Sequence, residues 1–229
     1  DVTGTFTHPK NLTELCSERG MLTGVITTDE TSGATPAAFS AHSSSRDNTE
    51  DITEDQLASD IDLIWGAQNG VATKEDAEAN GFTYVTTTAE MLALKEGSRS
   101  FAQFTNDLWT LAPSDINTPN LEMMTKKAID ILDDTEEGFF LMVEGGKVDT
   151  GGHANSANTT TSEYLAFDAA FKVAIDFAKG RTDTVVICAP DHDTGGMVIP
   201  EDPEVAAAAV AAVMAGENPS SITWESYSH

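Results

Sequence analysis

Two short apolar runs, each followed at once by acidic and histidine side chains, limit what this chain can fold into. The first run, residues 138–143 (GFFLMV), is too short for a helix and predicts a buried strand. Glu144 follows it directly, and Asp149 and His153 come soon after, on a glycine-rich segment that we expect to be a tightly folded loop. In open α/β sheets, ligands bind beyond the carboxyl ends of the strands, so these side chains are candidates for a binding site.

The second run, residues 184–190 (TVVICAP), predicts another buried strand and ends directly in Asp191 and His192. Carboxylate oxygens suit Mg²⁺, whereas an aspartate beside a histidine suits Zn²⁺. A single Asp–His pair at a strand end is more often a capped turn. Two such clusters, however, can supply the ligands of a two-metal centre. Asp193 is expected either to support a ligand or to cap a turn.

Strand-like and helix-like segments alternate along the chain. The other expected strands cover residues 21–27, 61–65, 82–86 and 100–104. The expected helices cover residues 12–19, 36–42, 54–59, 74–80, 89–95, 121–132, 162–179 and 205–215. The core side of the helix at 162–179 is expected to carry Leu165, Phe167, Ala170, Phe171, Ala174 and Phe177. This alternation predicts the α/β class, with a mainly parallel sheet, helices on both faces, and a single domain over residues 1–229.

Five segments together resemble the alkaline phosphatase family of two-zinc, one-magnesium phosphomonoesterases. They are residues 27–47, 138–157, 163–178, 184–196 and the terminal SYSH at 226–229, in the order that the family has them. The resemblance implies an alkaline-phosphatase-like fold. Any one segment would be moderately specific, and the combination is highly specific.

The resemblance implies two zinc sites. Asp149 and His153 match ligands of the first zinc, and His229 stands where its third ligand is expected. Asp191 and His192 match ligands of the second zinc.

The resemblance also implies a magnesium site and a phosphate-binding arginine. Glu144 and Thr35 match the magnesium ligands, and Arg46 matches the arginine that binds the substrate phosphate. A planar guanidinium can donate two parallel hydrogen bonds to phosphate oxygens. Gly33, two residues before Thr35, stands where family members vary, so the surroundings of magnesium are left to water or to a neighbouring side chain.

Two departures from the family pattern concern catalysis. The family's nucleophile is a serine in an Asp-Ser-Ala motif upstream of the Thr35 position, and this motif does not occur here. The aspartate that bridges the second zinc and the magnesium lies further upstream and has no match either. We therefore expect an internal fragment of a longer enzyme, incomplete at both ends and inactive alone.

The chain is strongly acidic, with 38 Asp and Glu against 12 Lys and Arg and a net charge of −26. Nucleic acids and anionic membrane surfaces attract positive charge, so neither is expected as a partner. The charge favours adaptation to high salt, where screening reduces self-repulsion, and the alternative is simply an acidic secreted enzyme. Cys16 and Cys188 are expected to be small apolar residues, with a disulfide between them as the other possibility.

The expected function is hydrolysis of small phosphate monoesters by two Zn²⁺ and one Mg²⁺, through a phosphoserine intermediate. The family also implies a homodimer in the periplasm or outside the cell. Two alternatives stay open. One is a related metal-dependent phosphodiesterase or phosphoglycerate mutase, and the other is a non-enzymatic, acidic metal-binding fragment.

Overall fold

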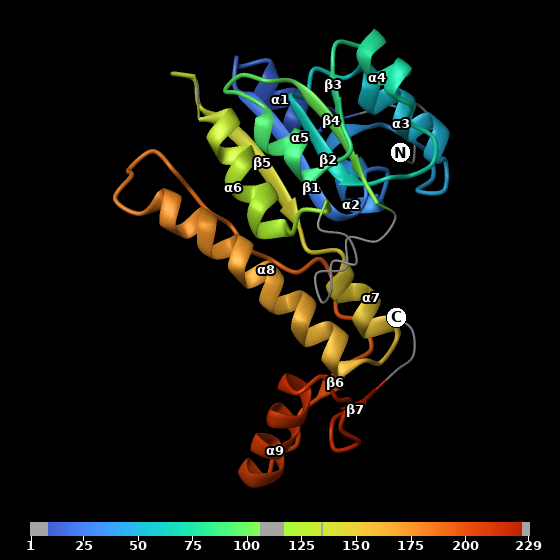
Figure 1. Cartoon of the computed structure of the whole chain (residues 1–229), viewed down its shortest axis with the longest axis vertical. Coiled ribbons are helices and arrows are strands. Elements are labelled where there is room, and N and C mark those ends of the chain that lie inside the picture. The colour runs from blue at the N-terminus through green and yellow to red at the C-terminus, as the bar shows by residue number, and fades with distance from the viewer. Residues whose placement is uncertain (1–8, 106–116, 134, 226–229) are drawn as a thin grey trace. The chain divides into compact units, whose positions relative to one another are not determined.

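The computed structural model describes residues 9–105, 117–133 and 135–225 (Figure 1). Contacts divide the chain into two compact units. The first unit runs as far as Glu144 and the second begins at Gly145, while residues 120–122 also group with the second. The single domain expected over residues 1–229 stays a prediction.

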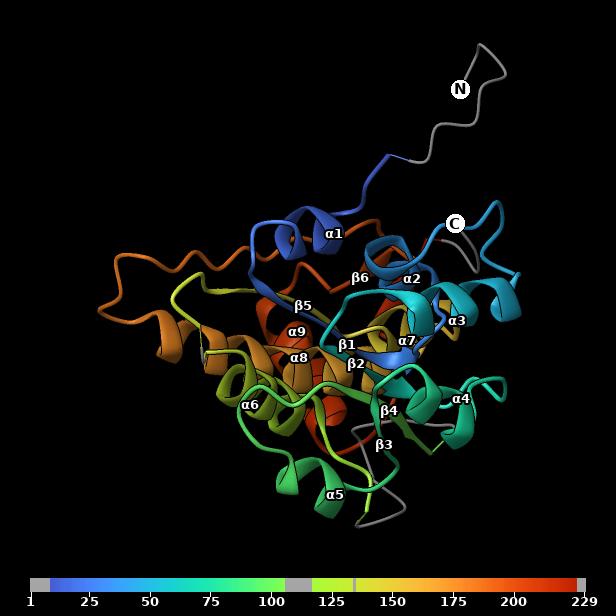
Figure 2. The ribbon, with the colours of Figure 1, turned by 90° about the horizontal axis from the view of Figure 1, so that it is seen from above.

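The first unit is built on a five-stranded parallel sheet with the strand order β3-β4-β2-β1-β5. The strands are β1 (Leu22–Glu30), β2 (Leu63–Ala67), β3 (Thr83–Val85), β4 (Ser100–Phe104) and β5 (Phe139–Glu144). The helices are α1 (Leu12–Ser17), α2 (Ala34–Ser40), α3 (Thr49–Ala58), α4 (Lys74–Ala79), α5 (Thr88–Ala93) and α6 (Leu121–Leu132). Figure 2 shows α1 and α2 on one side of the sheet and α5 and α6 on the other. The predicted α/β class, mainly parallel with helices on both faces, is confirmed.

Local sequence explains where several of these helices begin. Asn11 caps α1 and Thr87 caps α5, and each forms a capping box with the glutamate three residues later, Glu14 or Glu90. The strands β2 and β4 are buried throughout, because helices cover both of their faces. A core cluster of buried residues joins them to α3 and α4: Leu57, Ile61, Ile64, Ala77, Phe82 and Phe101.

Asp62 places a carboxylate against this core. Its Oδ2 accepts a hydrogen bond from the backbone N–H of Thr23 at 2.7 Å. Burial raises the pKa of Asp62, although that hydrogen bond and the charge of Arg99 oppose the rise. A raised pKa means that the native state holds the proton more tightly than the unfolded chain does. The contribution of Asp62 to stability is therefore greatest in acid and is lost as the pH rises through the native pKa.

We therefore expect Asp62→Asn to raise the melting temperature at pH 7 by a few degrees. The amide still accepts the hydrogen bond from Thr23 but carries no charge to desolvate. The gain should shrink as the pH is lowered toward the ordinary pKa of an aspartate. Thermal denaturation from pH 4 to pH 8 tests this, and a variant that is less stable than the parent protein at pH 7 would contradict it.

The second unit contains α7 (Lys147–His153), α8 (Ala157–Ala178), α9 (Pro203–Met214) and an antiparallel pair, β6 (Met197–Val198) with β7 (Thr223–Trp224). A small core of Ala157, Ala209, Val213 and Ile222 joins α8 to α9. Within the described ranges, every helix is too short or too polar to cross a lipid bilayer.

Three predictions for this unit are wrong. Residues 184–190 do not form a strand, and Val185 and Ile187 are 83% and 85% exposed, because no described strand pairs with this run. The glycine-rich segment after β5, predicted as a loop, contains α7. Of the predicted core side of α8 only Ala170 is buried, and Leu165 is exposed. Cys188 is also exposed, and both cysteines are free.

Candidate metal centre

Asp149 and His153 lie four residues apart on α7, so their side chains share one face of that helix. The Nε2 atom of His153 is 3.4 Å from Oδ2 of Asp149. Two buried glycines between them allow α7 to pack closely. A Cβ atom on Gly151 would lie 2.6 Å from the backbone N of Thr160, and one on Gly152 would lie 2.8 Å from the carbonyl oxygen of Thr194.

Thr194 joins this pair to the second predicted pair. Its hydroxyl donates to Oδ1 of Asp149 at 2.6 Å and lies 3.1 Å from Nδ1 of His192. Because the hydroxyl of Thr194 donates its one hydrogen to the carboxylate, its oxygen must accept a hydrogen bond from the Nδ1–H group of His192. The backbone carbonyl of Asp193, 3.3 Å from the same nitrogen, is also only an acceptor. Both contacts therefore place the proton on Nδ1 and leave the lone pair of Nε2 available to a metal.

The Nε2 atom of His192 lies 3.2 Å from Oδ2 of Asp191. With its proton on Nδ1, a neutral His192 directs the lone pair of Nε2 toward the carboxylate oxygen of Asp191. Both atoms are hydrogen-bond acceptors, so they repel each other at this distance. A cation between them, or a second proton on the imidazole, removes the repulsion. The Nε2 atom of His192 and the carboxylate of Asp191 can therefore hold a cation between them.

The spacing within each pair fits zinc. Zinc binds histidine nitrogen and carboxylate oxygen at about 2.0–2.1 Å, so two ligand atoms of a tetrahedral site lie about 3.3 Å apart. The separations of 3.4 Å and 3.2 Å match this value. Within the described ranges, however, no three His, Cys, Asp or Glu side chains gather closely enough to hold an ion. Each pair would need a further ligand, and His229, predicted as the third ligand of the first zinc, lies outside the described residues.

Thr194 provides a test of this linkage. We expect Thr194→Val to weaken zinc binding by about 10–100-fold, because support of a ligand by a neighbouring hydrogen bond is typically worth that much. Valine keeps the shape of threonine but removes the hydroxyl that fixes His192 and Asp149. Thr194→Ser is the matched control and should bind nearly as well as the parent chain. Equal zinc affinities for the valine and serine variants, measured by competition with a chelator, would contradict the role of the hydroxyl.

The other predicted site residues belong to the first unit. Glu144 ends β5 beside Thr27 of β1, whose hydroxyl donates to its Oε2 at 2.5 Å. Thr35 lies in the first turn of α2, which begins at Ala34, whereas the sequence predicted a helix start at residue 36. Arg46 lies in the turn between α2 and α3. Arg46 is exposed and has no ion pair among the described residues, so its guanidinium is available to an anion.

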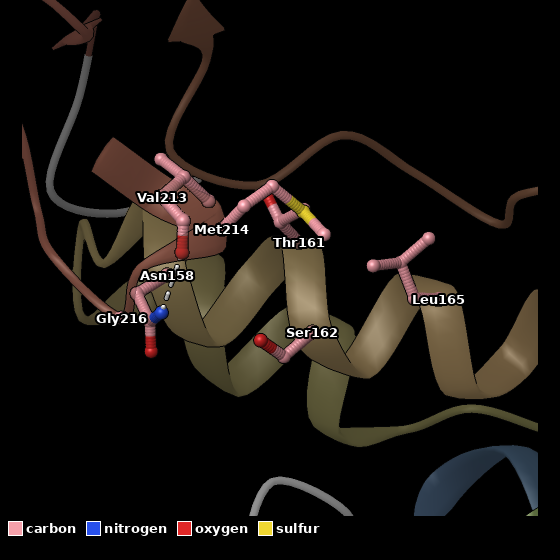
Figure 3. A pocket seen from close by; sticks show the side chains of 7 residues that line it. All are labelled: Asn158, Thr161, Ser162, Leu165, Val213, Met214 and Gly216. Carbon is pink, nitrogen blue, oxygen red and sulfur yellow. Dashed lines mark hydrogen bonds between the residues drawn. The ribbon is translucent and has the colours of Figure 1, made fainter. Parts of the chain in front are cut away.

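A hollow between α8 and α9 differs from the candidate metal centre in the chemistry of its lining (Figure 3). Asn158 donates there to the carbonyl oxygen of Val213 at 3.1 Å. None of the side chains that line the hollow is ionisable, so this hollow is not a candidate for metal chemistry.

Comparison with known proteins shows the family of the chain. A family model described as alkaline phosphatase matches residues 7–65 and 58–228. The chain belongs to the alkaline phosphatase family. Alkaline phosphatase 3 of Bacillus subtilis (strain 168) is 34% identical over 205 residues, which is 84% of this chain and 44% of that protein. Alkaline phosphatase 4 of the same organism is 40% identical over 127 residues, 56% of this chain and 27% of that protein.

Solved structures of alkaline phosphatases share the fold. A cold-active alkaline phosphatase from a psychrophilic Shewanella species matches with a TM-score of 0.77 at 31% identity, over 85% of this chain and 49% of that one. A variant of the TAB5 alkaline phosphatase, with Mg bound in its M3 site, matches with a TM-score of 0.66 at 30% identity, over 84% of this chain and 60% of that one. This chain spans less than half the length of the two Bacillus relatives.

Sequence reasoning did not single out Thr194 or Thr27. Thr194 stands in the same glycine-rich string as Asp191 and His192, and that nearness was the only signal. Thr27 gave no signal, because only the parallel register of β1 against β5 brings it opposite Glu144.

Proposed function

We propose that this alkaline phosphatase family chain supplies the metal-binding and phosphate-binding residues of a phosphomonoesterase with two Zn²⁺ and one Mg²⁺. The observation that carries the proposal is the pair of Asp–His couples, each with tetrahedral ligand spacing, held together by the hydroxyl of Thr194. Membership of the family supports the reaction class.

In this proposal the chain's residues hold three ions. Asp149 and His153, with His229, bind the first zinc, and Asp191 with His192 binds the second. Glu144 and Thr35 bind magnesium, for which carboxylate and hydroxyl oxygens are suitable donors. Zinc at such a site supplies a Lewis acid that favours deprotonation of a hydroxyl nucleophile and stabilises a departing oxygen.

Arg46 orients the substrate by donating two parallel hydrogen bonds to phosphate oxygens. Its place in a short turn leaves the guanidinium exposed to an incoming dianion. The nucleophile is a serine outside this chain, whose oxygen bonds to phosphorus as the ester oxygen leaves. Water then cleaves the phosphoserine and returns the serine hydroxyl.

The setting of the enzyme follows from charge and family. We place it in the periplasm or outside the cell, as a homodimer that acts on small phosphate monoesters. The net charge of −26 repels dianionic substrates at long range, so we place its working conditions at high salt, where this repulsion is screened.

The test uses the protein that contains this chain together with its flanking sequence, loaded with Zn²⁺ and Mg²⁺ at high salt. We expect hydrolysis of p-nitrophenyl phosphate to exceed hydrolysis of bis-p-nitrophenyl phosphate. A preference for the diester would instead indicate a phosphodiesterase. Tight zinc binding with no turnover of either substrate would indicate a metal-binding protein without this activity.

A further inference from the structure

Strand β1 is irregular where it approaches the proposed magnesium ligands. Against β2, Ile26 pairs with Trp65 and the next paired residue is Glu30, opposite Ala67. Three residues of β1, from Thr27 to Asp29, therefore stand opposite the single residue Gly66. Such a bulge bends its strand and redirects the side chains it carries, and bulges are frequent beside active sites.

Gly66 makes room for this bulge. A Cβ atom on Gly66 would lie 2.8 Å from the carbonyl oxygen of Asp29 and 2.8 Å from Cγ2 of Thr27. Real Cβ atoms do not approach backbone so closely, so a side chain at position 66 would push the bulge away. The course of β1 through Asp29 is thus fixed by its neighbour in the sheet.

Gly33 shows where the carboxylate of Asp29 lies. A Cβ atom on Gly33 would be only 2.6 Å from Oδ2 of Asp29. The carboxylate therefore occupies the space that a side chain at position 33 would fill. Position 33 directly precedes α2 and is two residues before Thr35, which lies in the first turn of that helix.

Thr27 connects Asp29 to Glu144. The hydroxyl of Thr27 donates to Oε2 of Glu144 at 2.5 Å and accepts from the backbone N–H of Asp29 at 2.9 Å. Thr27 is fully buried and Asp29 is half-buried, so this connection lies beneath the surface at the carboxyl end of β1.

We propose that Asp29 is a further ligand of the Mg²⁺ held by Glu144 and Thr35, an inference that rests on the proposed function. Its carboxylate takes the place of a side chain at position 33. The resulting donors are two carboxylates and a hydroxyl, which suits an ion that favours oxygen and retains several of its waters.

The test is calorimetric titration of MgCl₂ into the zinc-loaded protein that contains this chain with its flanking sequence, at high salt, which measures metal binding without turnover. We expect Asp29→Asn, which keeps the shape but removes the charge, to weaken Mg²⁺ binding at least about tenfold. Asp51→Asn on the exposed side of α3 removes the same charge elsewhere and should leave the affinity unchanged. Asp29→Gly combined with Gly33→Asp moves the carboxylate to position 33 and should restore most of the affinity.

Glu144→Gln separates the two ways in which the inference can fail. If Asp29→Asn binds Mg²⁺ as tightly as the parent chain while Glu144→Gln does not, Asp29 is no ligand but the proposed magnesium site stands. If Glu144→Gln binds normally, or the parent chain takes up no Mg²⁺, the proposed magnesium site is wrong and the role of Asp29 falls with it. Loss of affinity in Asp29→Asn without rescue by the double variant would also overturn the inference.

Discussion

Asp149→Ala should lower turnover of p-nitrophenyl phosphate by about 10³-fold or more, because a catalytic metal ion contributes several kcal/mol to stabilising the transition state. The substitution removes a carboxylate that is 3.4 Å from His153 and that also accepts the hydrogen bond of Thr194. Both proposed zinc sites should therefore be affected, the first by loss of a ligand and the second by loss of the support for His192. The measurement is zinc content per protein together with turnover, in the protein that carries its flanking sequence.

Asp168→Ala is the matched control for this experiment. Asp168 is an exposed aspartate on α8 in the same unit, so its loss changes the net charge equally without touching either Asp–His pair. We expect it to keep both zinc content and turnover. If Asp149→Ala retained its zinc and its activity, the assignment of α7 to the metal centre would be refuted.

Gly195→Ala should destabilise the second unit more than Gly180→Ala does. Gly195 has a φ of +79°, a backbone conformation that costs an ordinary residue about 1–2 kcal/mol. Its added Cβ would also lie 2.7 Å from the carbonyl oxygen of Gly152 and 2.8 Å from the Trp224 ring. Overpacking of this kind costs about 1–3 kcal/mol more. Because Gly152 and Thr194 are neighbours in this packing, zinc affinity should fall together with stability.

Gly180→Ala isolates the backbone term. Gly180 has a φ of +83°, and its added Cβ would meet nothing within 4 Å. It should therefore cost only the conformational penalty and leave zinc binding intact. Chemical denaturation of both variants, with zinc titrations alongside, makes the comparison. Equal losses of stability would contradict the close packing of Gly195 against Gly152.

The sequence predicted the first unit well because its elements carry strong local signals. β5 forms over a short apolar run, α1 starts at a capping asparagine, and the apolar runs of β2 and β4 are buried throughout. The run at 138–143 was predicted to be buried, but in β5 only Met142 is buried, so this part of the prediction is wrong. Fully buried parallel strands and capped helices are the elements for which local pattern and tertiary environment agree.

The second unit shows where such reasoning fails. The run at 184–190 has the composition of a strand, but composition reports only that a segment can be buried, and a strand also needs a neighbour for its backbone groups. Paired glycines at 151 and 152 suggested a loop, whereas in the structure they let α7 pack closely against Thr160 and Thr194. The hydrogen bond from Thr194 to Asp149, which links the two Asp–His pairs, joins segments more than forty residues apart, and no local pattern reveals it.

The most direct measurement is anomalous diffraction at the zinc absorption edge from crystals grown with Zn²⁺. We predict one zinc between the carboxylate of Asp149 and Nε2 of His153, and another between the carboxylate of Asp191 and Nε2 of His192, each bond about 2.0–2.1 Å long. The Nδ1 atom of His192 should remain hydrogen-bonded to Thr194. Zinc bound through Nδ1 of His192, or absent from both pairs, would contradict the proposed metal centre.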